Sequence, residues 1–199
     1  MILITLSGTD GSGKSTQLSL LREHFENDGK RVAYFHAVEF SLANRLNRNT
    51  RGKSEFKPGE EAANTKASPL SMLLRRIFFA VDLVRFRFFL RSLRKKGTDI
   101  LLSDRYFYDT FINLAYLSRP HVFRCPGEHF IPRPDAAFFL DISPEAVMRR
   151  ERVPEQGIEY IEEKRRLFAS MTKRWGLVRI DADRSKEDVF SSILTSLNF

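Results

Sequence analysis

The sequence is poor in cysteine and contains no long apolar run. Its 199 residues include one cysteine, Cys125, so no internal disulfide can form and a reducing compartment is expected. The longest apolar runs are about five residues, whereas a membrane-spanning helix needs roughly 20. The first residues read directly as a strand, without the basic and apolar regions of a signal peptide. These absences exclude a disulfide-stapled domain and a membrane-spanning protein, and they predict a cytoplasmic location.

Acidic residues are outnumbered by basic ones. The 33 Lys and Arg residues against 25 Asp and Glu give a net charge of +8. This balance suits phosphate ligands and would equally suit nucleic acid, so charge alone does not decide between them. The length and the 42% hydrophobic content are sufficient for a sizeable core. We therefore expect a single domain over residues 1–199.

A glycine-rich segment near the N-terminus carries the strongest motif. It matches the phosphate-binding pattern G-x-x-x-x-G-K-[ST], and it lies between an apolar run and a helical segment, which disfavours a chance turn. Glycines in such a loop let backbone N–H groups turn inward to bind anions at a helix N-terminus. Lys14 is expected to reach the β- and γ-phosphates, and the Ser15 hydroxyl to bind Mg²⁺. The predicted ATP-binding residues are Gly8, Thr9, Asp10, Gly11, Ser12, Gly13, Lys14, Ser15 and Thr16.

Strand-like and helix-like segments alternate along the chain. This order predicts an α/β fold with a five-stranded parallel sheet and helices on both faces, a three-layer sandwich of the P-loop NTPase type. Residues 49–68 are polar and aperiodic and are expected to form a flexible loop. The expected strands cover residues 2–6, 32–38, 99–103, 136–142 and 177–181. The expected helices are 17–25, 39–48, 69–96, 108–117, one beginning at 144, 158–175 and 185–197.

The helix expected over residues 69–96 has two apolar stripes. One contains Leu73, Ile77, Val81, Val84 and Phe88; the other contains Met72, Phe79, Leu83, Phe86, Leu90 and Leu93. A helix that is apolar on two sides is buried on two sides. One side is expected to face the sheet. The other is expected to pack either against the same chain or against a second copy in a homodimer.

Charged residues cluster where parallel strands are expected to end, which is where ligands bind such sheets. Asp104 is placed to hold Mg²⁺ and Arg105 to bind an acceptor phosphate; the alternative for this pair is a strand-end salt bridge. Arg149, Arg150 and Arg152 are expected to belong to a short catalytic lid over residues 149–158, or else to be an exposed basic helix end. His121, Cys125 and His129 have the spacing of metal ligands, but the prolines and glycine between them favour an irregular acceptor-side loop.

Together these motifs resemble the thymidylate kinase family. The resemblance rests on Gly8 to Gln17, Asp104-Arg105-Tyr106, Arg133-Pro134-Asp135 before a strand ending Leu140-Asp141, and Ile180-Asp181-Ala182. It implies five parallel strands, ATP as donor, Mg²⁺, a nucleoside monophosphate as acceptor and a homodimer. It further implies that Asp10 contacts the acceptor sugar, Arg105 its phosphate, and Phe79 the base. The loop has no arginine at Gly11 or Ser12, which resembles the members whose lid supplies the catalytic arginines.

The sequence departs from the family pattern at the acceptor side. His36 to Glu39 replaces the usual Arg-Glu-Pro, and Leu83 stands where an arginine usually reads the thymine. Leu114 stands in place of a glutamine, with Asn113 beside it as an acceptor-binding candidate. The missing phosphate-binding arginine is expected to be replaced by Arg45, Arg48 or Arg51, of which Arg45 is the acceptor-binding candidate. We expect a nucleoside monophosphate kinase acting on dTMP, with no specific nucleic-acid partner. The alternatives are a phosphotransferase with another small acceptor and a non-enzymatic ATP-binding or nucleic-acid-binding protein.

Overall fold

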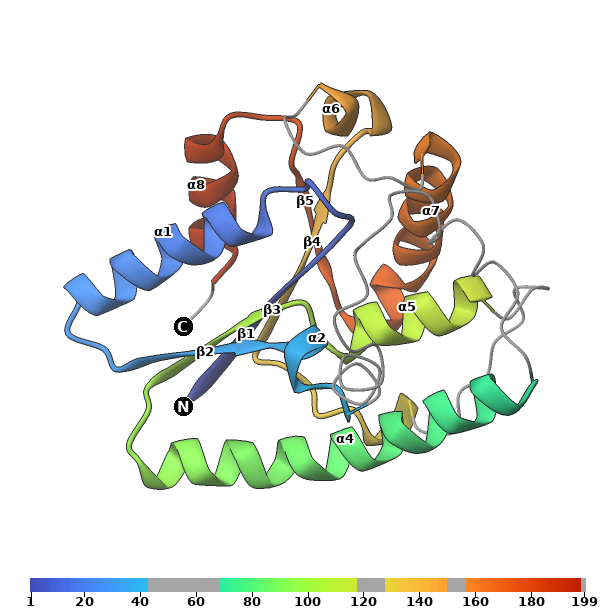
Figure 1. The fold of residues 1–199 in the computed structure, drawn as a ribbon. Coiled ribbons are helices and arrows are strands. Elements are labelled where there is room, and N and C mark those ends of the chain that lie inside the picture. The colour runs from blue at the N-terminus through green and yellow to red at the C-terminus, as the bar shows by residue number, and fades with distance from the viewer. Residues whose placement is uncertain (43–68, 118–127, 150–156, 198–199) are drawn as a thin grey trace, which may run out of the picture.

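The computed structural model describes residues 1–42, 69–117, 128–149 and 157–197 (Figure 1). Several predicted features lie outside these ranges: the loop over residues 49–68, most of the expected lid, and the side chains of Arg45, Arg150 and Arg152, together with His121 and Cys125. Of the predicted metal-ligand set, only His129 is described. No helix in the described ranges is both long enough and apolar enough to cross a membrane.

Five strands form one parallel sheet in the order β2-β3-β1-β4-β5. The central strand β1 therefore lies between β3 and β4, which places the loop that follows it in the middle of the carboxyl edge. The predicted fold class is confirmed. The strands are β1 (Ile2–Ser7), β2 (Val32–His36), β3 (Ile100–Asp104), β4 (Ala136–Asp141) and β5 (Val178–Asp181).

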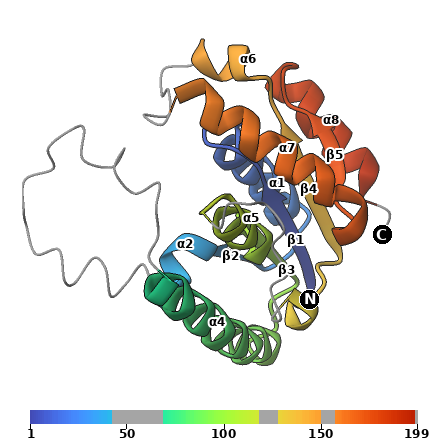
Figure 2. The ribbon, with the colours of Figure 1, turned by 90° about the vertical axis from the view of Figure 1, so that its right-hand side faces the viewer.

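Helices cover both faces of the sheet and make three layers (Figures 1 and 2). Alternate residues of each strand point to opposite faces, so Leu3 and Phe139 join one core while Ile4 and Phe138 join the other. Helices α4, α5 and most of α7 pack on the first core, and α1, α6 and α8 on the second. The helices are α1 (Lys14–Asn27), α2 (Ala37–Phe40), α4 (Pro69–Lys95), α5 (Phe107–Leu117), α6 (Pro144–Met148), α7 (Gly157–Trp175) and α8 (Lys186–Ser196).

The segment after β2 differs from the prediction. The second strand ends at His36 instead of continuing to residue 38, because Ala37–Phe40 forms the short helix α2. His36 caps this helix: its Nδ1 accepts a hydrogen bond from the Glu39 N–H at 3.3 Å. The prediction of one helix starting at residue 39 is therefore wrong at its beginning, because α2 ends at Phe40 and Ser41 is extended; residues 43–48 lie outside the described ranges.

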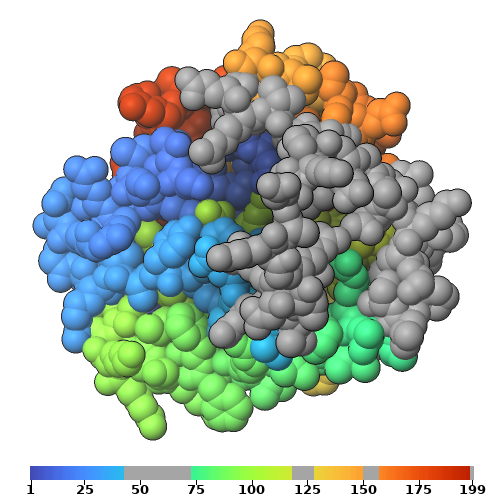
Figure 3. Space-filling view, in the orientation of Figure 1, coloured from blue at the N-terminus to red at the C-terminus, as the bar shows by residue number. Residues whose placement is uncertain are grey.

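Helix α4 presents its two apolar stripes to different surroundings. Phe79, Leu83, Phe86 and Leu90 are buried against the sheet and α5. The other stripe is exposed, with Phe88 at 61% and Leu73 at 54% relative accessibility. In Figure 3, α4 runs as a green band along the lower edge of the molecule. Within the described residues, intrachain packing therefore accounts for only one of the two predicted stripes.

Candidate active site

The loop from Gly8 to Gly13 connects the central strand to α1. Gly8, Gly11 and Gly13 have φ values of 150°, 81° and 89°, a region that other residues rarely adopt. A Cβ at Gly8 would also lie only 2.8 Å from the Leu140 carbonyl oxygen and 2.9 Å from Ser12 Oγ. Glycine is thus required at Gly8 both by backbone conformation and by space, and α1 begins directly after Gly13.

Lys14 is folded back over this loop. Its Nζ donates hydrogen bonds to the carbonyl oxygens of Gly8 and Thr9, at 3.1 and 2.7 Å, and to Ser12 Oγ at 3.3 Å. Burial of the ammonium, followed by the positive charge of Arg105, lowers the pKa of Lys14 to about 8. The side chain is thus held at the loop by backbone oxygens, in a position from which it can exchange them for phosphate oxygens.

Asp104, at the end of β3, lies opposite the start of α1. Its Oδ2 accepts hydrogen bonds from Ser15 Oγ at 3.4 Å and from the Tyr34 hydroxyl at 3.0 Å, and His36 Nε2 is 4.0 Å away. Its Oδ1 is buried without a hydrogen-bond partner in the described structure. Desolvation and the negative charge of Asp104 raise the pKa of Tyr34, so the hydroxyl stays protonated and donates. Sequence reasoning did not identify Tyr34 as a partner of Asp104. The one available signal was its position close to the carboxyl end of β2, two residues before His36.

Arg105 follows Asp104 but does not pair with it. Its φ of 61° makes it the one non-glycine residue with positive φ in the described ranges. The guanidinium contacts Asp10 of the loop and lies 3.6 Å from Asp109 Oδ1. Within the described residues, Arg105 therefore forms strand-end salt bridges with Asp10 and Asp109, and its role in acceptor binding stays a prediction.

Asp109, in the first turn of α5, joins the loop to the Asp104-Arg105-Tyr106 segment. Its Oδ2 accepts hydrogen bonds from Ser7 Oγ at 2.6 Å and from the Tyr106 N–H at 2.9 Å, and Oδ1 accepts from the Gly8 N–H at 3.5 Å. Its side chain is almost completely buried. Sequence reasoning missed Asp109 because the pattern does not indicate that its partners Ser7 and Gly8 lie beside it.

A pocket beside Arg105 contains several predicted acceptor residues. It is lined by Phe79 and Phe78 of α4, by Asn113 and Leu114 of α5, and by Arg105 itself. Phe79 forms a wall, packed edge-to-face on Phe107 with ring centroids 5.9 Å apart. Leu114 lines the pocket, whereas Leu83 belongs to the core.

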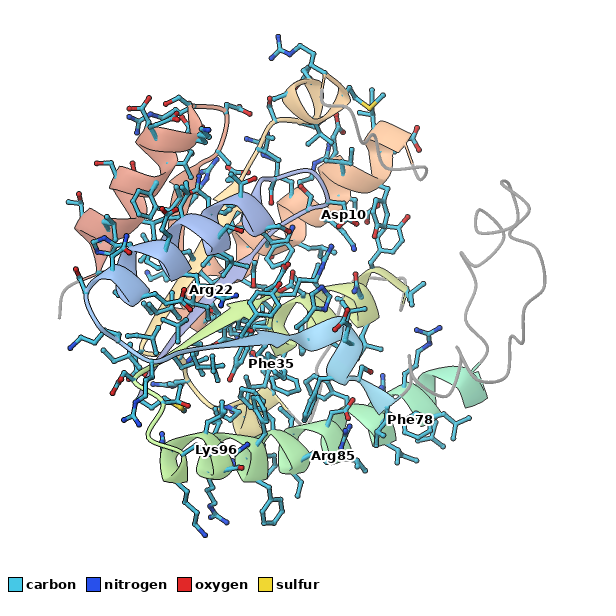
Figure 4. All side chains as sticks on the ribbon, turned by 60° about the vertical axis from the view of Figure 1, so that its left-hand side comes forward. Asp10, Arg22, Phe35, Phe78, Arg85 and Lys96 are labelled. Carbon is cyan, nitrogen blue, oxygen red and sulfur yellow. The ribbon has the colours of Figure 1, made fainter. Side chains whose placement is uncertain are left out.

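Asp82 and Phe40 also line this pocket, and an ion pair between Asp82 and Arg85, which sequence reasoning did not reveal, lies beside it. Asp82 binds Arg85 at 2.6 Å and accepts a hydrogen bond from the Leu42 N–H at 3.1 Å. Arg85 in turn donates to the Phe40 carbonyl at 3.0 Å and lies 4.4 Å over the Phe40 ring. These contacts attach the segment after β2 to α4; in Figure 4, Arg85 and Phe78 project from α4.

The remaining predicted residues lie only partly within the described ranges. Arg149 is exposed at the C-cap of α6, and its two partners in the expected lid lie outside the described ranges. His129 belongs to a short 3₁₀ turn, Glu128–Phe130. Within the described residues, no group of three or more His, Cys, Asp or Glu side chains could hold a metal ion.

Comparison with known proteins agrees with this arrangement. The thymidylate kinase family profile matches residues 6–193. A thymidylate kinase of Akkermansia muciniphila is 27% identical, over 98% of this chain and 91% of its own. A probable thymidylate kinase of Methanosphaera stadtmanae is 28% identical, over 96% and 94%. The crystal structure of thymidylate kinase from Ehrlichia chaffeensis has the same fold, with a TM-score of 0.59, 21% identity, and coverage of 99% of this chain and 98% of that one. With its phosphate loop, its Asp104-Arg105 segment and a profile match over nearly its whole length, the chain belongs to the thymidylate kinase family.

Proposed function

We propose that this protein is a nucleoside monophosphate kinase that transfers the γ-phosphoryl group of ATP to dTMP, giving ADP and dTDP. The observation that carries the proposal is the convergence of three groups at one edge of the sheet: the glycine loop with Lys14, the Ser15–Asp104 pair, and Arg105 at the mouth of an aromatic pocket. Membership of the thymidylate kinase family supports the same activity.

The donor phosphates bind in the loop over Gly8 to Thr16. Backbone N–H groups and Lys14 hold the phosphate oxygens and stabilise the charge that develops as the phosphoryl group moves. Mg²⁺ fits between Ser15 and Asp104, because a hydroxyl and a carboxylate are the oxygen donors it prefers and Asp104 Oδ1 is buried without another partner. When bound, the ion neutralises charge on the β- and γ-phosphates. Arg149, Arg150 and Arg152 are proposed to cover the transferring group from the lid.

The acceptor occupies the pocket beside Arg105. The guanidinium holds the acceptor phosphate in a bidentate manner, Asp10 contacts the sugar, and Phe79 and Asn113 contact the base. Arg45 adds a second cation for the acceptor phosphate. An oxygen of that phosphate attacks the γ-phosphorus, and the bond from phosphorus to the bridging oxygen of ADP breaks. Because Leu83 and Leu114 cannot hydrogen-bond the base, we propose weaker discrimination against dUMP than a fully hydrogen-bonded site would provide.

The proposed activity is tested by coupled ADP release with a panel of nucleoside monophosphates. We expect dTMP to be phosphorylated, with dUMP and other pyrimidine monophosphates within a few kcal/mol of it in transition-state free energy. Lys14→Ala should abolish turnover while the protein stays folded by circular dichroism. If no nucleotide in the panel accepts a phosphoryl group while ATP still binds, the assignment to dTMP is wrong.

A further inference from the structure

Lys164 lies on α7, and its ammonium is buried. The residue is 6% exposed, and its Nζ lies 4.4 Å from the centroid of the Tyr160 ring, one turn earlier on the same helix. In the part of the chain that the structure describes, the contact of this ammonium is the face of the Tyr160 ring. Placing a lysine side chain in a largely buried position is costly to stability. Its presence here therefore points to a functional explanation.

The orientation of α7 is fixed on both sides of Lys164. The neighbouring Arg165 binds Asp141 at the end of β4, with Nε 2.6 Å from Oδ1. One turn further along, Phe168 stacks on Phe139 of the same strand, with centroids 4.9 Å apart and planes 13° apart. These contacts fix the rotation of α7 on the sheet. Packing of the helix therefore keeps the Lys164 side chain buried, although a lysine side chain is normally more stable in solvent.

Lys164 lies within electrostatic reach of the phosphate-handling groups. Burial, followed by the positive charge of Arg105, lowers the pKa of Lys164 to about 8, and the charges of Asp10, Asp109 and Lys14 also act on it. Asp10 lies beside the α7 ribbon in Figure 4. Lys14, Arg105 and Lys164 are thus three cations that converge on one region.

The three cations differ in what they bind in the free protein. Lys14 is held by two loop carbonyls, and Arg105 by the carboxylates of Asp10 and Asp109. Within the described residues, the Lys164 ammonium contacts the face of the Tyr160 ring, an interaction worth about 0.5–2 kcal/mol. Of the three cations, Lys164 therefore loses the weakest interaction of the free protein when it binds an anion.

We propose that Lys164 is a further catalytic residue whose ammonium binds a phosphate oxygen of the nucleotides at this site. The inference rests on the proposed function. Arg105 and Lys164 repel each other in the free protein, and a phosphate between them attracts both. The oxygen belongs either to the acceptor phosphate or to the γ-phosphoryl group of ATP, because both meet beside Arg105.

The test compares Lys164→Met, which removes the charge at similar volume, with Lys164→Arg, which keeps it. Lys173→Met makes the same change at an exposed position of the same helix and serves as the matched control. We expect Lys164→Met to lower kcat/KM at least tenfold and Lys164→Arg to restore part of the loss. Thermal unfolding separates this role from a structural one: Lys164→Met should melt no lower than the wild type.

Calorimetric binding of dTMP alone, and of a non-hydrolysable ATP analogue alone, identifies the source of the phosphate. Weaker dTMP binding in Lys164→Met assigns the contact to the acceptor, weaker binding of the analogue assigns it to the donor, and a lower kcat with both affinities intact assigns it to the phosphoryl group in transit. Unchanged kcat/KM and affinities would overturn the proposal. So would a lower melting temperature that accounts for the lost activity.

Failure of the proposed function would look different. Wild-type protein that binds inorganic pyrophosphate but does not phosphorylate dTMP would remove the assigned reaction. The role of Lys164 would then be decided by pyrophosphate affinity alone. A tenfold weaker affinity in Lys164→Met than in Lys173→Met would support the anion contact, and equal affinities would overturn it.

Discussion

At the scale of single residues, Asp109 connects the donor loop to the acceptor arginine. One carboxylate receives hydrogen bonds from the end of β1, from the first glycine of the loop and from the segment before α5, and it also faces Arg105. The donor loop and the acceptor arginine are therefore positioned by a common group. A change at Asp109 should affect both stability and acceptor binding.

We expect Asp109→Asn to raise the acceptor KM and to destabilise the fold by about 1–3 kcal/mol. The amide has one acceptor oxygen, so it cannot serve Ser7, Tyr106 and Arg105 together, and its NH₂ group would face another donor. Urea unfolding and acceptor kinetics measure the two effects. Asp188→Asn, at an exposed position of α8, is the control. An unchanged acceptor KM in Asp109→Asn would show that Arg105 is positioned without it.

Lys164 should also make the free energy of unfolding depend on pH. In the folded protein its pKa is about 8, below its ordinary value of 10.5, because burial disfavours the charged form. Between these values the unfolded chain holds a proton that the folded protein has lost, so stability rises with pH. Below about pH 8 both states are protonated, and the full cost of the buried charge, on the order of 3 kcal/mol, is present.

Lys164→Met should therefore be more stable than the wild type near pH 7, with the difference shrinking as pH rises toward 10. Arg105, Asp10, Asp109 and Lys14 face this group and titrate in both proteins, so comparison at each pH removes most of their contribution. Chemical unfolding at several pH values measures the difference. A stability difference that is constant with pH would contradict the lowered pKa.

At the scale of elements, α4 is apolar on two faces but buried on only one of them in the described residues. Its inner face builds an aromatic cluster in which Phe86 contacts Phe35 and Phe107, with centroids 4.7 and 5.1 Å apart. Its outer face exposes Leu73, Ile77, Val81, Val84 and Phe88. A contiguous apolar stripe of this kind on a surface helix is typical of a protein–protein interface. In the homodimer expected from the family resemblance, a second copy of the chain would cover this stripe.

We expect the protein to sediment as a dimer at micromolar concentration and Val84→Glu to shift it toward monomer. A charge at the centre of a two-fold interface is brought close to its own copy and is desolvated there. Lys173→Glu on α7 is the control for the change in net charge. If the wild-type protein sediments as a monomer at this concentration, the prediction that a second copy covers the outer stripe is wrong.

At the scale of the whole molecule, short sequence patterns were sufficient to predict the fold class and most helices and strands, and to propose the donor site. The phosphate loop needs glycines, a lysine and a hydroxyl at fixed spacing, and alternation of apolar strands with amphipathic helices predicts a parallel sheet. These signals depend only on residues close together along the chain. Hence Lys14, Ser15, Asp104 and Arg105 could be proposed as site residues from the sequence.

The tertiary structure decided which distant residues meet. Ser7 and Asp109 are 102 positions apart and become partners because the sheet order places β1 beside β3. Tyr34 reaches Asp104 across the β2–β3 pair, and Lys164 turns toward the loop because Arg165 and Phe168 fix the rotation of α7. Sheet order and helix rotation follow from packing of the whole core, so no local pattern could predict these contacts.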